Sequence, residues 1–353
     1  MADLFFDITA TGDGSGSSYD NAKLYSDTDF QTAAGAWSAG DGIYFVTDGT
    51  DIFDVSVQIT LLAVSTNANR CGVYGVDRST GLASDDIRAY LRWTGAASTD
   101  MFINNSAYID FWGMKAANVD ADVFGLGKTG YSLYNCEFDN ITGNVLAGIH
   151  TNVCINNIIA TNCDIYILAF VNHGIVANSS FLLGAQSCIG CSAPPSFHSC
   201  IIHDFVNLGI YNAGSLSEMV IDECDGTAVH VKGNFVLAIK HSRLTNNLKA
   251  IDSISYPSVI ENVRYKDNGT DVVTPGSAAD SLLEINTGQI SGDAYRDIDN
   301  HDFRPPLDDP YTAIESPIGA RDEDTNIAFR TAGIQVEPAT GGGRIPRARS
   351  HGV

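Results

Sequence analysis

The sequence predicts an all-β protein built as a parallel β-helix, a solenoid in which short strands and turns coil around one core. The main observation is a loose unit of about 21 residues that recurs between Tyr131 and Tyr256 without a sustained helical period. A fixed period made of strand and turn signals is typical of stacked repeats. A unit of this length is too short for a strand, a crossover helix and a second strand, but it suits a coil of two or three short strands.

Each repeat holds a short apolar strand, a small polar residue or Cys, an apolar pair, an Asn or Asp, and a second strand. The copies span 131–138, 152–159, 174–181, 197–202 and 235–244. Equivalent positions, at steps of 21, 22 and 21 residues, are Asn135, Asn156, Asn178 and Ser199. Because one coil cannot bury its own apolar face, each copy is expected to stack on its neighbours.

The repeated texture of apolar residue, Asn, Cys, Phe, Asn and Gly-Ile resembles the right-handed parallel β-helix (pectin-lyase-like) superfamily. The resemblance covers roughly residues 40–304. That superfamily includes polysaccharide lyases and hydrolases, adhesins, and the spikes and fibres of bacterial viruses. The resemblance therefore implies an architecture and leaves the chemistry open.

The chain divides into three predicted segments: an N-terminal loop and capping segment (1–39), the parallel β-helix (40–304), and a C-terminal closing segment with an extended basic tail (305–353). Residues 29–37 suit a short helix, and residues 40–49 suit a turn, a strand and a turn. This pair resembles the entry of β-helix proteins, in which a helix covers the first coil. Such a cap shields a strand edge that would otherwise pair with another chain.

Charge and composition exclude several partners. The chain has 20 basic and 42 acidic residues, a net charge of −22, which argues against nucleic acid because phosphate contacts need clustered Lys and Arg. No apolar stretch is long enough for a membrane span, and the N-terminus lacks the basic and apolar regions of a secretory signal. The acidic surface is a solvated face, a binding face for divalent cations, or a face that docks on a basic partner.

The eight cysteines are expected to be free buried thiols, since a chain made in a cytoplasm does not form disulfides readily. Cys136 and Cys200 occupy the same small-residue position in their repeats. A thiol packs there as a small apolar group.

One set of polar residues suggests catalysis. Asp204, Asp225, Asn246 and Asp267 are 21 residues apart, so in a β-helix they would form one column with a spacing of about 4.8 Å. Paired carboxylates at such distances serve glycoside hydrolysis. The favoured interpretation is that they are turn residues, because the column extends back to Asn162 and, one residue out of step, to Asn140. Asn and Asp tolerate left-handed backbone in turns.

The remaining motifs assign no catalytic residue, metal or cofactor. The histidines His173, His198, His203, His230 and His241 lack metal-ligand spacing and are expected to be scattered. The segments 162–164 and 172–174 only partly resemble polygalacturonase motifs. The Arg-x-Pro-x-x-Arg pattern of pectate lyases is matched by 344–349, which lies beyond the coils.

Together these features favour a virion structural protein, a capsid decoration or spike that projects from a bacteriophage particle and contacts host-surface glycan. Arg344, Arg347 and Arg349, which follow the glycines 341–343, or the N-terminal cap would then dock on other virion proteins, and a homo-oligomer such as a trimer is expected. The alternatives are a polysaccharide-degrading enzyme, either a pectate-lyase-like lyase or a glycoside hydrolase, and a glycan-binding adhesin without catalysis. The enzyme alternative stays open, although no motif supports it.

Overall fold

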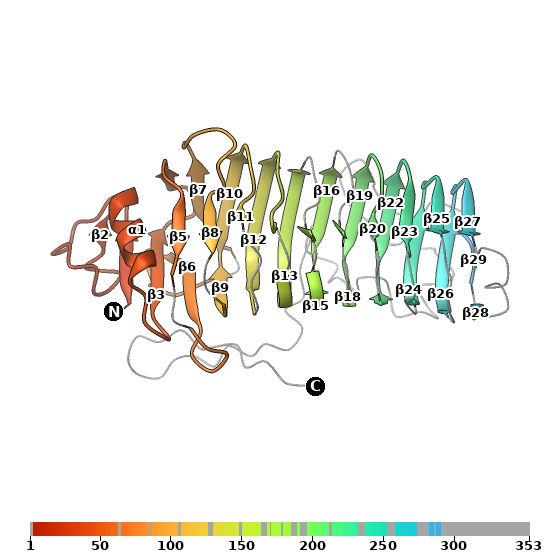
Figure 1. The fold of residues 1–353 in the computed structure, drawn as a ribbon, viewed down its shortest axis with the longest axis horizontal. Coiled ribbons are helices and arrows are strands. Elements are labelled where there is room, and N and C mark those ends of the chain that lie inside the picture. Colours follow the sequence, from red (N-terminus) through yellow and green to blue (C-terminus); the bar gives the residue numbers. More distant parts are fainter. Residues whose placement is uncertain are drawn as a thin grey trace.

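The computed structural model is a right-handed parallel β-helix with one helix at its N-terminal end (Figure 1). It describes residues 3–290, except for 63–64, 85, 105–106, 126–129, 148–149, 164–167, 170, 178, 185–188, 191–195, 212–213, 232–236, 253–257, 274–281 and 286. The strand pairs within this part of the chain are parallel, and each joins a strand to its counterpart in the next coil. The fold predicted from the repeat is therefore confirmed.

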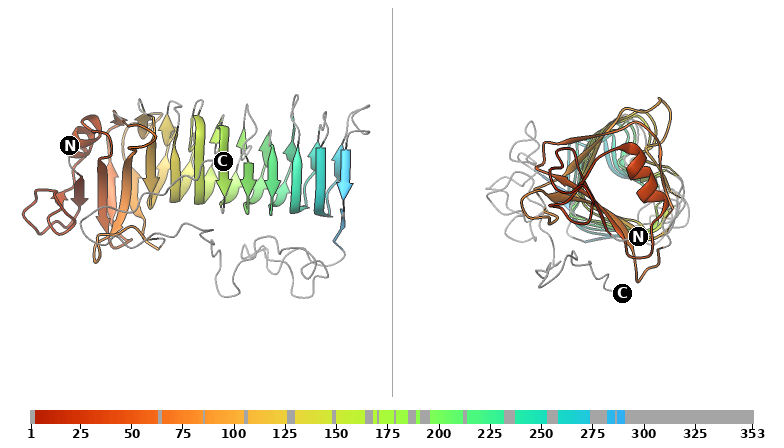
Figure 2. Two further views of the ribbon diagram at one scale, coloured as in Figure 1. Left: turned by 90° about the horizontal axis from the view of Figure 1, so that it is seen from below. Right: turned by 90° about the vertical axis from the view of Figure 1, so that its left-hand side faces the viewer.

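The solenoid is triangular when it is seen along its axis (Figure 2). We call its three sides face 1, face 2 and face 3, in the order in which the chain runs along them. Faces 1 and 2 belong to one continuous 20-stranded sheet, and face 3 is formed by a three-stranded and a six-stranded sheet. Most buried apolar side chains of the three faces point inward and form one core cluster along the axis, and a smaller cluster of Ala22, Tyr44, Val46 and Val76 is separate from it.

The strands of face 1 are β1 (Leu4–Asp7), β3 (Gly42–Thr47), β6 (Cys71–Asp77), β9 (Ile109–Trp112), β15 (Val171–Ala177), β18 (Ser196–His198), β21 (Ser215–Ser217) and β28 (Leu282–Ile285), with β2 (Lys23–Leu24) beside β1. Those of face 2 are β4 (Ile52–Val55), β7 (Ala89–Trp93), β10 (Met114–Val119), β16 (Ser180–Gly184), β19 (Ile201–Phe205), β22 (Val220–Cys224) and β29 (Gly288–Gln289). Four longer strands run from face 1 onto face 2: β12 (Ser132–Ile141), β13 (His150–Cys163), β24 (Ala238–Thr245) and β26 (Ser258–Lys266). Face 3 contains β5 (Ile59–Leu61), β8 (Phe102–Asn104), β11 (Phe124–Gly125), β14 (Leu168–Ala169), β17 (Ile189–Gly190), β20 (Ile210–Tyr211), β23 (Thr227–His230), β25 (Lys249–Asp252) and β27 (Thr270–Val273).

Two rows of residues with left-handed backbone turn the chain at the corners, with φ between 48° and 58°. The first corner row, between faces 1 and 2, consists of Asn135, Asn157, Ser199, Glu218, His241 and Asn262. The second corner row, at the end of face 2, consists of Asn118, Asn140, Asn162, Asp204, Glu223, Asn246 and Asp267. Asn and Asp dominate because their short polar side chains tolerate this conformation better than most others.

The rows correct three details of the predicted register. Asn157, and not Asn156, is the partner of Asn135, and its side-chain amide donates to the Asn135 Oδ1 at 3.2 Å. Asn140, which the sequence spacing placed one residue out of step, lies in the second corner row.

The third detail concerns Asp225, which does not belong to the second corner row, because Glu223 occupies that place opposite Asp204. The coil between these two residues is 19 residues long and the next one 23 (223 − 204 and 246 − 223). The two deviations cancel, so Asp204, Asn246 and Asp267 keep the predicted positions.

The N-terminal end of the core is covered by α1 (Asp27–Gly35), two residues ahead of the predicted range. The Ser26 hydroxyl accepts a hydrogen bond from the Asp29 backbone N–H, which caps the helix, and Phe30, Ala33 and Ala34 are buried against the first coil. The predicted capping helix is therefore confirmed. The sequence pattern did not predict β1, which pairs with β3 and extends face 1 by one strand beyond the first coil.

The described cysteines are free thiols, as predicted, and all are buried except Cys154, which is partly exposed: Cys71, Cys136, Cys154, Cys200 and Cys224. Cys136 and Cys200 share one inward-facing column, the position that follows the first corner row. Burial raises the pKa of the Cys136 thiol to about 12, so this group stays protonated and packs as an apolar side chain. The side chains of Cys163, Cys188 and Cys191 lie outside the described residues.

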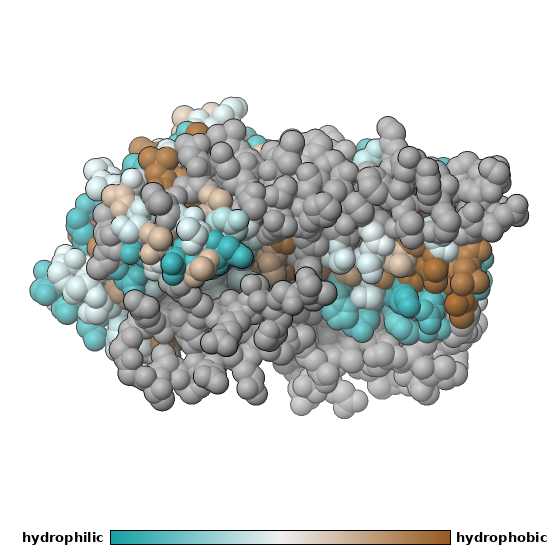
Figure 3. Space-filling view, turned by 60° about the horizontal axis from the view of Figure 1, so that its bottom comes forward, coloured by the Kyte–Doolittle hydropathy of each residue, from teal (hydrophilic) through white to brown (hydrophobic). Residues whose placement is uncertain are grey.

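The description ends at Ile290, so residues 291–304 of the predicted β-helix and the whole segment 305–353, including Arg344, Arg347 and Arg349, lie outside it. Near this end, Leu283 and Ile285 of β28 are exposed, and apolar side chains gather at the same end of the surface shown in Figure 3. Within the described residues, no helix has both the length and the apolar character that a membrane crossing needs.

Asparagines tie the last coils together at the position that follows the second corner row, where Asn247 is buried and Asn268 is partly buried. The Asn247 carbonyl oxygen accepts from the Cys224 N–H at 3.0 Å, and its amide donates to the Ile221 carbonyl at 3.2 Å. Asn268 repeats the arrangement one coil later, where its carbonyl oxygen accepts from the Asn247 N–H at 3.0 Å. Each amide thus satisfies buried backbone groups that the turn leaves without strand partners.

Replacing Asn247 by alanine should lower the free energy of unfolding by about 2–3 kcal/mol, because buried backbone donors and acceptors lose their partners. Urea denaturation followed by circular dichroism measures this loss. Asp267→Gly is the matched control: it lies in the second corner row, is exposed, and has a φ of 52° that glycine adopts without strain. Equal unfolding midpoints for Asn247→Ala and the wild type would contradict the assigned role.

Candidate functional site

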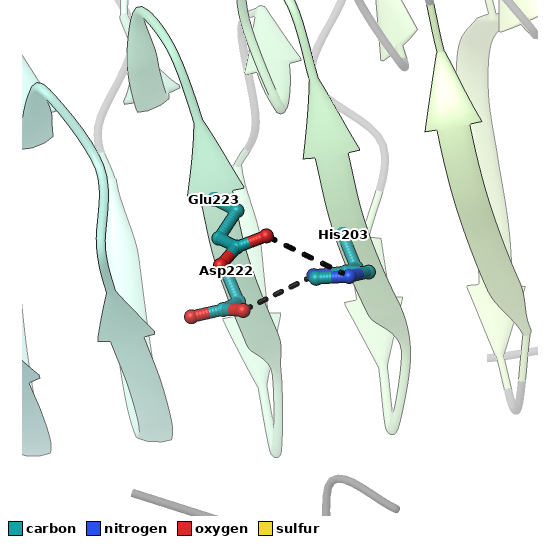
Figure 4. Close-up of side chains that lie close together, drawn as sticks. All are labelled: His203, Asp222 and Glu223. Atoms are coloured by element: carbon teal, nitrogen blue, oxygen red, sulfur yellow. Dashed lines mark hydrogen bonds and ion pairs between the residues drawn. The ribbon is translucent and has the colours of Figure 1, made fainter. Parts of the chain in front are cut away.

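A histidine and two carboxylates from neighbouring coils meet on the outer side of face 2. His203 lies on β19, and Asp222 is directly opposite it on β22, so the register of the two strands places the side chains next to each other. Glu223 follows in the second corner row, where the left-handed backbone directs its side chain back toward β19. Figure 4 shows both carboxylates on one strand, facing the imidazole on the neighbouring strand.

The distances define the geometry of this cluster. His203 Nδ1 lies 3.1 Å from Asp222 Oδ2, and Nε2 lies 3.9 Å from Glu223 Oε2. The side chains of His203 and Asp222 are 8% and 0% exposed, whereas that of Glu223 is 50% exposed. In this cluster His203 and Asp222 are therefore buried, and the Glu223 carboxylate is exposed to solvent.

Asp222 is fixed from a third coil. Its Oδ1 accepts hydrogen bonds from the Thr245 hydroxyl of β24 and from the Asn246 amide, the latter at 2.9 Å. A buried carboxylate that accepts several hydrogen bonds has one orientation and keeps its remaining oxygen on the imidazole. Asp222 therefore positions the ring of His203.

One ligand atom from each of His203, Asp222 and Glu223 can be chosen so that all three lie within 4.8 Å of one another. Two kinds of chemistry suit such a group. It can hold a divalent metal ion through nitrogen and carboxylate oxygen. It can also move a proton, because a carboxylate that orients an imidazole makes the imidazole a general base.

Of the three aspartates that the sequence spacing placed in one column, the structure keeps Asp204 and Asp267 in one row and excludes Asp225. Asp204 and Asp267 are exposed and have left-handed backbone, as expected for turn residues. Asp225 lies beyond the end of β22, outside that row. The acid that stands opposite Asp204 is Glu223, which the regular 21-residue spacing missed.

The four histidines whose side chains are described lie in separate places, as expected, and among them only His203 belongs to a group of possible metal ligands. Each contacts a polar group one coil further along. The pairs are His198 with Ser217, His203 with Asp222, His230 with Asp252 and His241 with Asn262. The side chain of His173 lies outside the described residues. The missed signal was the actual register, since steps of 19, 19, 22 and 21 residues separate the partners.

Face 1 carries a second distinctive feature, an outward row of aromatic residues. In successive strands the row consists of Phe5, Tyr44, Tyr74, Trp112 and Tyr134. Ring centroids are 4.4 Å apart for Phe5 and Tyr44, 5.0 Å for Tyr44 and Tyr74, and 5.4 Å for Trp112 and Tyr134. Because many of the rings stack on each other along the axis, their contacts add stability between coils.

Comparison with solved structures identifies the fold. A rhamnogalacturonan lyase aligns over 81% of this chain and 87% of its own, with a TM-score of 0.54 and 9% identity. The likeness shows that the two chains share the parallel β-helix fold. At this identity the likeness concerns the backbone alone, and it carries no catalytic residue across.

Two further similar structures have lower scores and support no argument. The pectate lyase Pel9A aligns over 79% of each chain, with a TM-score of 0.46 and 12% identity. ORF18 of Geobacillus virus E2 aligns over 77% of this chain and 60% of its own, with a TM-score of 0.37 and 11% identity. No protein-family model and no curated protein matches the sequence.

Replacing Asp222 by alanine should lower the free energy of unfolding by about 3 kcal/mol, because the Thr245 hydroxyl, the Asn246 amide and His203 lose a shared acceptor in a buried place. Asp225→Ala, three residues away and exposed, should change it by less than about 0.5 kcal/mol. Thermal and urea unfolding of the two variants measure the difference. Equal losses would show that Asp222 does not organise this cluster.

Proposed function

We propose that this chain is a virion structural protein: a β-helical capsid decoration or spike that projects from a bacteriophage particle and contacts glycan on the host surface. The coarser statement, a pectin-lyase-like β-helix suited to a structural or glycan-interacting role, rests on the fold. The specific role rests on how the surface of this solenoid is built.

The observation that carries the proposal is the use of outward charges to join coils along the axis. Arg92 of β7 pairs with Asp54 of β4, with Nε and Oδ1 2.7 Å apart. Lys115 of β10 pairs with Glu137 of β12 in the same way. Near the other end, Lys240 Nζ lies 2.7 Å from Glu261 Oε2 on the next coil.

Single exposed ion pairs contribute little, but a series that repeats along one axis resists bending and shear between coils. The stacked rings of the aromatic row on face 1 also resist bending and shear between coils. A stiff, capped rod with these features suits a projecting appendage, which has to carry load and needs no moving parts.

The glycan contact is the finer part of the proposal. The aromatic row offers the partly exposed rings of Phe5, Tyr74, Trp112 and Tyr134. Beside Tyr108, Arg70 donates to Asp110 and Ser132 on the same face. Aromatic side chains with nearby polar groups suit sugar rings, which present apolar C–H faces and hydroxyl edges.

A polysaccharide-degrading enzyme is the second candidate, because a rhamnogalacturonan lyase shares the fold and because His203, Asp222 and Glu223 form a group capable of proton transfer. Shared fold alone does not transfer activity. The two candidate functions predict different outcomes for the glycan. A structural protein binds the glycan and releases it intact, whereas an enzyme shortens it.

Incubation of the protein with acidic and neutral polysaccharides should leave polymer length unchanged, as measured by size-exclusion chromatography and by absorbance of unsaturated products. If the chain does shorten a polymer, Asp225→Asn should retain the activity, because Asp225 stands outside both the corner row and the His203 cluster. Cleavage that Glu223→Gln abolishes and Asp225→Asn retains would overturn the structural role in favour of the enzyme.

Cutting the chain after Ala339 should leave a folded, soluble body that no longer joins the particle. The removed tail contains Arg344, Arg347 and Arg349, whose charge-assisted contacts would contribute about 1.5–3 kcal/mol each and add up in a ring of subunits. Occupancy on purified particles, measured by quantitative mass spectrometry, decides the outcome.

The matched control for the truncation is the full chain with the three tail arginines changed to lysine, which keeps the charge. Normal occupancy of the truncated protein would assign the anchor to the N-terminal cap. A full-length protein that is never found on a particle would refute the structural role itself.

A further inference from the structure

We propose that His203 and Glu223 bind a first-row divalent metal ion of the Zn²⁺ class, which joins the coils of β19 and β22, with Asp222 orienting the imidazole from behind. The inference is independent of the proposed virion role. It rests on the distances within the cluster, on the support of Asp222, and on the arrangement of charge at the second corner row.

The hydrogen bond between the imidazole and Asp222 determines which ring nitrogen can bind the metal ion. Asp222 accepts from Nδ1 at 3.1 Å and is itself held by Thr245 and Asn246, so the Nδ1 hydrogen points to Asp222 and Nε2 points toward Glu223. A carboxylate behind a histidine is the usual support of a metal-binding imidazole, since it fixes the tautomer and raises the basicity of the ligand.

The distance between the two ligand atoms suits one ion. His203 Nε2 and Glu223 Oε2 are 3.9 Å apart. Zinc takes nitrogen and oxygen ligands at about 2.0–2.2 Å, so two of them at a tetrahedral angle lie about 3.4 Å apart. A small rotation of the half-exposed Glu223 side chain closes the difference. Mixed nitrogen and carboxylate ligands favour zinc and its neighbours over calcium or magnesium.

Charge at the corner row provides a separate argument. Asp204 stands directly opposite Glu223 in the register, and both side chains are exposed. Like charges in opposite positions of neighbouring strands are destabilising unless a cation lies between them. Asp204 therefore adds negative charge that favours a cation beside Glu223, and water or a hydroxyl group of a ligand completes the coordination.

The same two coils contain an internal comparison at the first corner row. His198 stands opposite Ser217, and its Nε2 lies 3.7 Å from Glu218 Oε2, a pair that matches His203 and Glu223 in spacing. Two groups differ: Ser217 replaces Asp222 behind the imidazole, and Ser199, which donates to Glu218 at 2.7 Å, replaces Asp204. His198 and Glu218 thus lack a carboxylate that orients the imidazole, and they lack a second acid opposite the glutamate. We expect this pair to bind metal far more weakly.

The test uses the full chain without an affinity tag, stripped of metal with a chelator and kept in excess Mg²⁺ to occupy the general acidic surface. Zn²⁺ alone is titrated by calorimetry, and Co²⁺ alone by its visible absorption, which reports ligand number and geometry. The wild type should bind with a saturable heat and show a higher melting temperature with Zn²⁺ than with chelator.

Glu223→Gln and His203→Gln should each remove this binding, and Asp222→Asn should weaken it about 10- to 100-fold. His198→Gln should bind as the wild type does. Because Glu223 is exposed, Glu223→Gln keeps the fold even if a variant of the buried His203 does not, and circular dichroism checks both. Wild-type affinity in Glu223→Gln, equal loss in His198→Gln and His203→Gln, or no Zn²⁺ binding above the Mg²⁺ background would each overturn the proposal.

Discussion

The structure depends on one constraint: each coil must return to the register of the coil before it, so that the backbone hydrogen bonds of all three faces continue along the axis. In the regular coils from β10 onward, the chain turns sharply at two corners per coil through residues with left-handed backbone, a conformation that few residues other than glycine adopt easily. Thirteen residues in the two corner rows do so, and most are Asn or Asp. The composition of the corners follows from backbone geometry and not from chemistry at the surface.

Register then decides which side chains meet. An inward position stays inward through the whole solenoid, which is why one column can contain Cys136, Ile158 and Cys200 with no loss of packing. An outward position stays outward, so unlike charges in one column become ion pairs and aromatic residues become stacks. Polar pairs on the surface therefore arise between residues about one coil apart in sequence, and they tie neighbouring coils without adding contacts within a coil.

The sequence was sufficient for the architecture, because the repeat reports both the apolar columns and the corner residues. It predicted the capping helix and the corner role of Asp204, Asn246 and Asp267 from turn chemistry alone. It failed at Asp225 for a physical reason: a solenoid fixes the register of its strands but leaves the loops between faces 3 and 1 free to change length. The coil that contains Glu223 is two residues shorter than the average repeat and the next is two residues longer, so a search at constant spacing finds the correct residues on both sides and the wrong one between them.

The His203 cluster could not be predicted for the same reason, since its partners meet only after the shorter coil is recognised. The comparison with His198 then shows what is specific about it. Both histidines face a glutamate in a corner row one coil further along, and that recurrence follows from register alone. Register does not require a buried aspartate with three hydrogen-bonding partners behind one imidazole, because Ser217 occupies the equivalent place elsewhere on the same coil. Burying Asp222 costs free energy that a serine would avoid, and this cost is the strongest physical reason to assign the cluster a role beyond holding the coils together.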